Sequence, residues 1–166
     1  RRVSAPGTAP RPTGGGLALR VPPVALSVIL AAIMWAASRA WPSWRLVIPG
    51  RRIVAVVLFL VAAAIGLAGV RAFHRARTTS NPLRPERASA LVSSGIYRHT
   101  RNPMYVALAL ALLAWAAWLG HALAPAGVVA FVAWMNRFQI APEERALQAL
   151  FGEEFERYRA EVRRWL

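Results

Sequence analysis

The sequence contains no cysteine, no lysine and no aspartate. Without cysteine there is no disulfide framework, no thiolate ligand for a metal ion and no cysteine nucleophile, and we predict no metal site. Because lysine and aspartate are also missing, the charge comes from 21 arginines and seven glutamates, and the formal net charge is +14.

Charge is scarce overall: 17% of residues are charged, 57% are hydrophobic and seven are tryptophan. A mean hydropathy of +0.38 is too high for a fully solvated surface, and the composition excludes a disordered or collagen-like chain. The alternative of buried helices in a soluble protein would need polar helices to cover them, and only the last 24 residues could serve.

Three long runs lack charge: residues 21 to 38, 53 to 70 and 102 to 136. Each of the first two, at 18 residues, would make a helix of about 27 Å, close to a hydrocarbon thickness of about 30 Å. The third is too long for one crossing and contains Gly120, His121 and Pro125, so we expect a helical hairpin, 103 to 119 and 123 to 137. The predicted fold is an all-α, polytopic integral membrane protein with about four transmembrane helices and a C-terminal amphipathic helix.

Arginine placement predicts the orientation of these helices. With four crossings, 17 of the 21 arginines fall on the side that holds the two termini and the second loop. Cytoplasmic loops are rich in arginine and lysine, so we expect both termini in the cytoplasm.

Three parts are predicted along the chain: a flexible tail rich in Arg, Pro and Gly over 1 to 20, two transmembrane helices over 21 to 70, and a catalytic part over 71 to 166. In the last part, apolar residues recur every three or four positions from Leu147 to Trp165, which indicates an amphipathic helix. Gly152 either weakens this helix or marks a bend. The helix could lie on the membrane surface or fold back over the second loop.

The second loop, residues 71 to 102, leads directly into the third apolar run. Asn102 is a good N-cap and Pro103 suits the first helical position. The helix therefore opens with free backbone N–H groups beside Arg98, His99 and Arg101, which favours an anion site. Arginines that bind lipid phosphates account for these charges equally well.

The segments LVSSGIYRHTRNPMY (91 to 105), PEE (142 to 144) and FGEEFERY (151 to 158) resemble the isoprenylcysteine carboxyl methyltransferase family and the related phospholipid methyltransferases. The resemblance implies a small integral membrane enzyme that binds S-adenosylmethionine on the cytosolic side without a Rossmann domain. It would transfer the methyl group to a lipophilic acceptor, in a bacterial inner membrane.

The resemblance and the anion site together imply a set of cofactor-binding residues. Such a pocket needs a carboxylate, an anion-binding helix end and an aromatic wall. The predicted cofactor contacts are Ser89, Ala90, Leu91, Val92, Tyr97, Arg101, Asn102, Pro103, Met104, Tyr105 and Glu144.

Two positions depart from the family pattern. Asn102 stands where the family usually has histidine, and Gln139 or Ile140 stands where carboxyl methyltransferases have an arginine for the substrate carboxylate. We expect Arg137 to substitute if the helix continues to Glu144, so these two residues are the predicted catalytic pair.

The methyl acceptor is left open between an isoprenylcysteine-like carboxylate and a lipid amine. A carboxylate acceptor needs no base, whereas an ammonium acceptor must first lose a proton. Glu143 and Glu144 are the only local carboxylates that could accept this proton. The alternatives are a non-enzymatic, arginine-rich lipid-binding protein and an NADPH-dependent membrane reductase on a related scaffold. The expected partners are the bilayer and a lipophilic or prenylated substrate, not nucleic acid; the oligomeric state is open.

Overall fold

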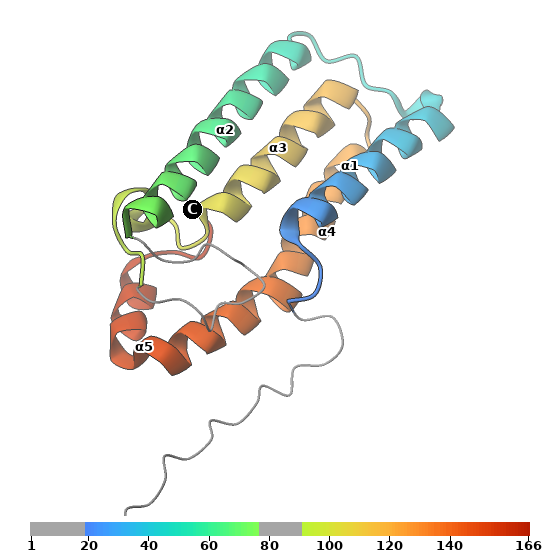
Figure 1. The fold of residues 1–166 in the computed structure, drawn as a ribbon. Helices are drawn as coiled ribbons and strands as arrows, with labels where there is room; N and C mark the ends of the chain where they lie inside the picture. Colours follow the sequence, from blue (N-terminus) through green and yellow to red (C-terminus); the bar gives the residue numbers. More distant parts are fainter. Residues whose placement is uncertain (1–18, 77–90) are drawn as a thin grey trace, which may run out of the picture.

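The computed structural model describes residues 19–76 and 91–166, and within these ranges it contains helices but no strand. Of the five α-helices, the first four stand side by side and the last lies across their lower end (Figure 1). In chain order the elements are α1 (Pro23–Ala40), the short helix η1 (Pro42–Trp44), α2 (Arg51–Ala76), the short helix η3 (Gly95–Arg98), α3 (Pro103–Leu119), α4 (Ala124–Trp134), the π-helical η4 (Met135–Ile140) and α5 (Ala141–Glu161).

Two of these helices are long and apolar enough to cross a membrane. They are α1, with 18 residues, and the first 22 residues of α2, with mean hydropathies of 1.6 and 2.9. The apolar α3 is shorter, at 17 residues, and α4 has only 11 but continues through η4 into α5. The predicted all-helical fold is therefore confirmed, whereas length and composition support two crossings and four stay a prediction.

Helices α2 and α3 approach closely because small residues lie between them. A side chain at Gly66 would meet Ala107 at 3.4 Å, and one at Gly69 would meet Met104 at 3.1 Å. Small residues allow such close backbone contact, and this packing matters most where the hydrophobic effect does not drive helices together. This contact fixes the first turn of α3 against the last third of α2.

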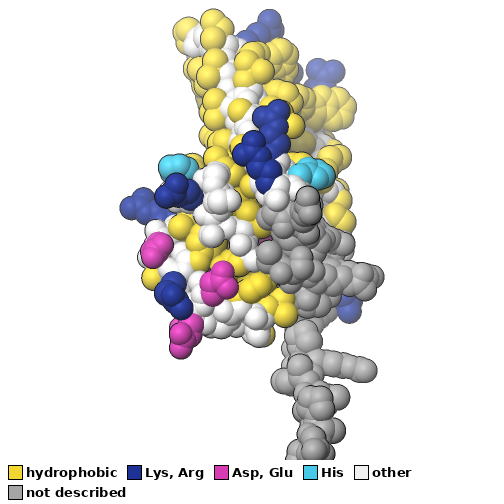
Figure 2. Space-filling view, turned by 60° about the vertical axis from the view of Figure 1, so that its left-hand side comes forward, with side chains coloured by type: hydrophobic (Ala, Val, Ile, Leu, Met, Phe, Trp, Pro, Cys, Tyr) yellow, Lys and Arg dark blue, Asp and Glu magenta, His cyan; other side chains and the backbone are white. Residues whose placement is uncertain are grey.

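A second close contact joins α1 to α4. A Cβ atom at Gly127 would lie 2.5 Å from the Met34 sulfur, so a larger residue there would displace the Met34 side chain. The core between α1, α3 and α4 is apolar, with Phe131 and Ile140 fully buried. Outward-facing side chains of α1 and α2 are also apolar, and hydrophobic groups cover the upper part of the molecule in Figure 2.

The upper end of α3 is closed by contacts with the loop between α1 and α2. Gly120 ends α3 in the left-handed region, with φ of +57°, and its carbonyl accepts a hydrogen bond of 2.8 Å from the Leu46 N–H. The buried His121 ring lies 2.9 Å from the Trp41 carbonyl, and the Arg51 guanidinium donates to the Trp118 carbonyl. These contacts hold the loop between α1 and α2 against the turn between α3 and α4.

Helix α5 bends at Gly152, where φ is +51°. After the bend, Phe155, Tyr158 and Val162 pack against Val92 and Tyr97 in a second core cluster. The sequence left two positions open for this helix, and the structure places its second half on the segment before α3. The same fold brings the last residues of the chain back beside the start of α3 (Figure 1).

Candidate active site

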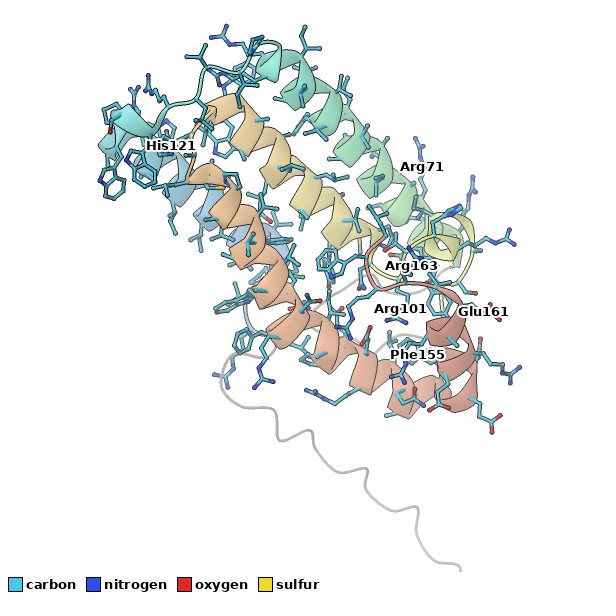
Figure 3. The ribbon with its side chains drawn as sticks, turned by 180° about the vertical axis from the view of Figure 1, so that it is seen from behind. Arg71, Arg101, His121, Phe155, Glu161 and Arg163 are labelled. Atoms are coloured by element: carbon cyan, nitrogen blue, oxygen red, sulfur yellow. The ribbon has the colours of Figure 1, made fainter. Side chains whose placement is uncertain are left out.

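The first turn of α3 is covered by the segment that follows α5, residues 162–166, which we call the C-terminal strap. The Arg101 N–H donates to the Arg163 carbonyl at 2.9 Å, and the Asn102 side-chain amide donates to the Arg164 carbonyl at the same distance. Figure 3 shows Arg101 and Arg163 close together, at the opposite end of α3 from His121. Asn102 is the N-cap residue, as predicted, but its side chain makes no capping bond and binds the strap instead.

The Glu144 carboxylate lies between two arginines. Arg101 Nη2 is 2.9 Å from Oε1, while Arg164 reaches Oε1 through Nε at 3.1 Å and Oε2 through Nη2 at 2.5 Å. The side chains of Arg101 and Glu144 are only 10% and 13% exposed. Charge-assisted bonds of this kind are among the strongest in proteins, so Glu144 is held as a fixed anion.

The neighbouring Glu143 has a different environment. Its Oε1 atom accepts a hydrogen bond of 2.5 Å from the Tyr105 hydroxyl and one of 2.6 Å from the Gln139 amide. Within the described ranges it forms no ion pair. Burial raises the pKa of Glu143 to about 7, although the bonds from Tyr105 and Gln139 work in the opposite direction.

Two adjacent carboxylates therefore have different chemical capacities. Glu144 is neutralised by arginines and can orient other groups, whereas Glu143 can gain or lose a proton near neutral pH. Environments that separate the properties of neighbouring titratable groups are typical of sites that use one of them as acid or base. The start of α5 consequently has a candidate proton acceptor beside a fixed ion-pair cluster.

Two tyrosines form the other wall. Tyr97 is buried, and its carbonyl accepts a 2.7 Å hydrogen bond from the Tyr158 hydroxyl. Burial raises the pKa of both phenols above their usual range, so these hydroxyls are neutral. The charge of Glu143 acts on Tyr97 as well, which locates Tyr97 in the same site.

One hydrogen-bond donor of Arg101 has no acceptor among the described residues. Its Nη1 donates to the Arg159 carbonyl at 2.9 Å, but its Nε is buried and has no hydrogen-bond partner in the described part of the protein. A buried donor without a partner costs free energy, and such exceptions are often places where a ligand binds. The N–H group would suit a ligand carboxylate.

The structure brings five of the eleven predicted cofactor contacts to one place. Tyr97, Arg101, Asn102, Tyr105 and Glu144 surround the start of α3. The remaining predicted contacts lie nearby or elsewhere: Pro103 and Met104 face Gly69 of α2, and Leu91 and Val92 belong to the cluster around Tyr97, whereas Ser89 and Ala90 lie outside the described residues.

Arg137 is not brought to Glu144. It lies exposed on η4 and makes no ion pair with a described glutamate. The helix does continue to Glu144, which was the condition for that role, but through a π-helical segment, whose wider turn changes the phase between the two residues. The buried residue on this segment that reaches the site is Gln139, and the role of Arg137 toward an acceptor stays a prediction.

Sequence reasoning missed Arg164 and the pairing of Gln139 with Glu143. Nothing in the spacing distinguishes Arg164 from the five other arginines after position 136, because its contact depends on the strap folding back. Gln139 had a signal, since it stands four positions before Glu143 and the two side chains therefore share one face of a helix.

Comparison with known families gives a direct assignment. Residues 50–154 match the family model described as phospholipid methyltransferase. The chain belongs to the phospholipid methyltransferase family. The matched segment includes η3, α3, both central glutamates and the bend at Gly152, and it ends before the strap.

One relative is an uncharacterized protein of Haemophilus influenzae. It is 54% identical over 63 residues, which are 38% of this chain and the whole of that protein. No solved structure matches the chain significantly. Membership of the family indicates methyl transfer to a lipid-like substrate, and together with the apolar helices it indicates a membrane protein.

Proposed function

We propose that this protein transfers a methyl group from S-adenosylmethionine to an amine carried by a lipid, at the cytoplasmic face of the membrane. The observation that supports an amine is Glu143, a part-buried carboxylate with neutral hydrogen-bond donors and no ion-pair partner in the described ranges. Such a carboxylate attracts an ammonium group and repels a second carboxylate. The amine is therefore favoured over the isoprenylcysteine-like acid.

The cofactor would bind around the first turn of α3. The partnerless Nε of Arg101 offers a donor for the cofactor's carboxylate, while Tyr97 supplies an aromatic wall. Glu144 and Arg164 hold the Arg101 guanidinium in place by charge. When bound, S-adenosylmethionine supplies an electrophilic methyl group on its sulfonium.

The chain's own part in the reaction is proton removal and positioning. The Glu143 carboxylate takes one proton from the acceptor ammonium, which leaves a neutral amine with a free electron pair and a carboxylic acid on Glu143. Tyr105 and Gln139 fix Oε1 through bonds of 2.5 and 2.6 Å. Positioning the amine next to the methyl group then supplies most of what this kind of displacement requires.

We further propose four membrane crossings with both ends of the chain in the cytoplasm. Helices α1 and α2 support two of them, and the hairpin of α3 with α4 and η4 supports the others. The site then lies on the side that holds 17 of the 21 arginines. Reporter fusions after Gly50 and His121 should both report the far side, and a cytoplasmic signal at both positions would contradict four crossings.

The deciding experiment compares Glu143→Gln with Glu153→Gln in detergent-solubilised protein. The acceptors are dioleoyl phosphatidylethanolamine, as the amine, and farnesylcysteine, as the carboxylate. Glu143→Gln should lower the rate on the amine by at least about 100-fold, because it removes the proton acceptor. Glu153 is exposed and remote, so Glu153→Gln should match the parent.

Two further measurements make this experiment specific. The parent rate should rise with pH through about 7, the pKa of Glu143, and the residual rate of Glu143→Gln should not. Isothermal titration with S-adenosylmethionine, S-adenosylhomocysteine and NADPH should give binding of the first two in both proteins. Methylation of farnesylcysteine but not of the amine would refute the amine assignment, and binding of NADPH alone would refute methyl transfer.

A further inference from the structure

An apolar groove lies on the outer side of α3, between α1 and α2. Its volume is about 510 Å³, within the range of small-molecule sites. Val28 of α1 and Phe59 of α2 form opposite walls, and Leu108 and Trp115 of α3 form part of its floor. The groove has the size of a ligand site but lies outside the polar cluster described above.

The lining of this groove has almost no hydrogen-bonding capacity to offer. The hydroxyl of Ser27 donates to the Pro23 carbonyl at 2.9 Å, and the indole N–H of Trp115 donates to the Ala31 carbonyl at 3.0 Å. These two polar groups are thus already satisfied within the protein. An occupant would gain only apolar contact, which suits a hydrocarbon chain and penalises any polar group.

Part of the groove lining continues a stripe of residues that begins at Tyr105, along one face of α3. Tyr105, Leu108, Leu112 and Trp115 follow one another at spacings of three, four and three residues, so they form a single stripe. Leu108 lies about 4.5 Å along the helix axis from Tyr105. The Tyr105 hydroxyl binds Glu143, so the lower end of the groove is about one helical turn from the residue that binds the proposed proton acceptor.

We propose that this groove binds a hydrocarbon tail of the lipid acceptor and thereby holds its amine at Glu143. The inference rests on the proposed function for the nature of the head group, but the groove's apolar lining and its continuity with Tyr105 are independent of it. The apolar walls bind the tail, and the polar cluster at the start of α3 binds the head. Chain length of the acceptor then becomes a determinant of KM.

The kinetic test fills the groove and varies the acceptor. Ala111→Phe and Ala31→Phe place a ring inside it, whereas Ala64→Phe adds the same ring to an exposed position of α2 outside the lining. With dioleoyl phosphatidylethanolamine, either groove variant should raise KM at least tenfold. With dibutyryl phosphatidylethanolamine, both should match the parent, and Ala64→Phe should match it with both acceptors. An equal loss on long and short acceptors, or no loss on either, would overturn the proposal.

A binding test separates this inference from the proposed function. Phosphatidylethanolamine with a diazirine near the end of one acyl chain should crosslink to peptides of α1 and α3 in the parent, and Ala111→Phe should abolish that crosslink. A phosphatidylglycerol probe with the same chain should crosslink far less, because its head group lacks an amine for Glu143. Equal yields from both probes would show ordinary bilayer lipid in the groove and overturn the tail assignment. Crosslinking that follows the amine in a protein that methylates neither lipid would refute the proposed function and leave the groove assignment standing.

Discussion

The two ends of α3 both attract arginine, but they use it differently. At the Leu119 end, Arg51 donates to backbone carbonyls that the end of the helix leaves without partners. At the Pro103 end, Arg101 and Arg164 bind the carboxylate of Glu144. Five of the six glutamates in the described ranges come after Glu143 in the sequence. All the acidic side chains that are visible in Figure 2 lie at this lower end of the molecule.

The difference teaches how to separate structural from functional charge in an arginine-rich membrane protein. An arginine that donates to the last carbonyls of a helix has a structural role at the helix end and does not indicate a ligand site. The Pro103 end instead contains a buried guanidinium nitrogen without a partner and a part-buried carboxylate without an ion pair, both in the described part of the chain. Incomplete pairing at one end, rather than the number of arginines, identifies the site.

The largest effect is expected from Glu144→Gln. The variant leaves the 10%-exposed Arg101 without its anionic partner, and breaking a buried pair in this way costs about 3 to 5 kcal/mol of unfolding free energy. Denaturation in detergent should show the loss. The control Glu153→Gln breaks an exposed contact of 4.0 Å with Arg157 and should change stability by less than about 0.5 kcal/mol. Equal stability of the two variants would remove the distinction between buried and exposed pairs.

An intermediate effect is expected from pH, through Glu143. Its pKa is about 7 in the folded protein against an ordinary 4.5, so the folded state binds the proton more tightly than the unfolded state. Stability should therefore be greatest below about pH 4.5 and should fall as pH rises to about 7, by up to about 3 kcal/mol. Glu143→Gln should remove this dependence when unfolding is followed across the same pH range. A variant that keeps the parent's full pH dependence would show that another group causes it.

The smallest effect is expected at the opposite end, from Gly120→Ala. Alanine at φ of +57° costs about 1 to 2 kcal/mol, and its Cβ would also lie 2.8 Å from the Arg51 guanidinium. The matched control is Gly50→Ala. Gly50 has φ of +71° but open space around it, so backbone strain is the only cause of its expected loss of stability. Gly120→Ala should thus be the more destabilising of the two. The double variant with Arg51→Ala should lose less unfolding free energy than the sum of the two single variants. Strict additivity would contradict the predicted clash between the new Cβ and the Arg51 guanidinium.

Much of the fold was predictable from local features. Pro103 indicated where one helix begins, and the charge-free runs indicated about where the apolar helices lie. Gly120 was correctly expected at a turn, and the bend at Gly152 is one of the two outcomes that the sequence left open. The phase of Arg137 was not predictable, because the π-helical segment depends on how α4 and α5 pack and not on a local signal.

The sequence by itself determined that this protein is helical, apolar and a member of a methyltransferase family, because helix length, hydropathy and motif spacing are properties of neighbouring residues. Only the tertiary structure decided which of two adjacent glutamates is a fixed anion and which can bind a proton. Glu144 is bound by arginines 20 and 43 positions away, and Glu143 by a tyrosine 38 positions away. Desolvation and ion pairing depend on these distant partners, so two identical side chains side by side in the sequence acquire different chemistry when the chain folds.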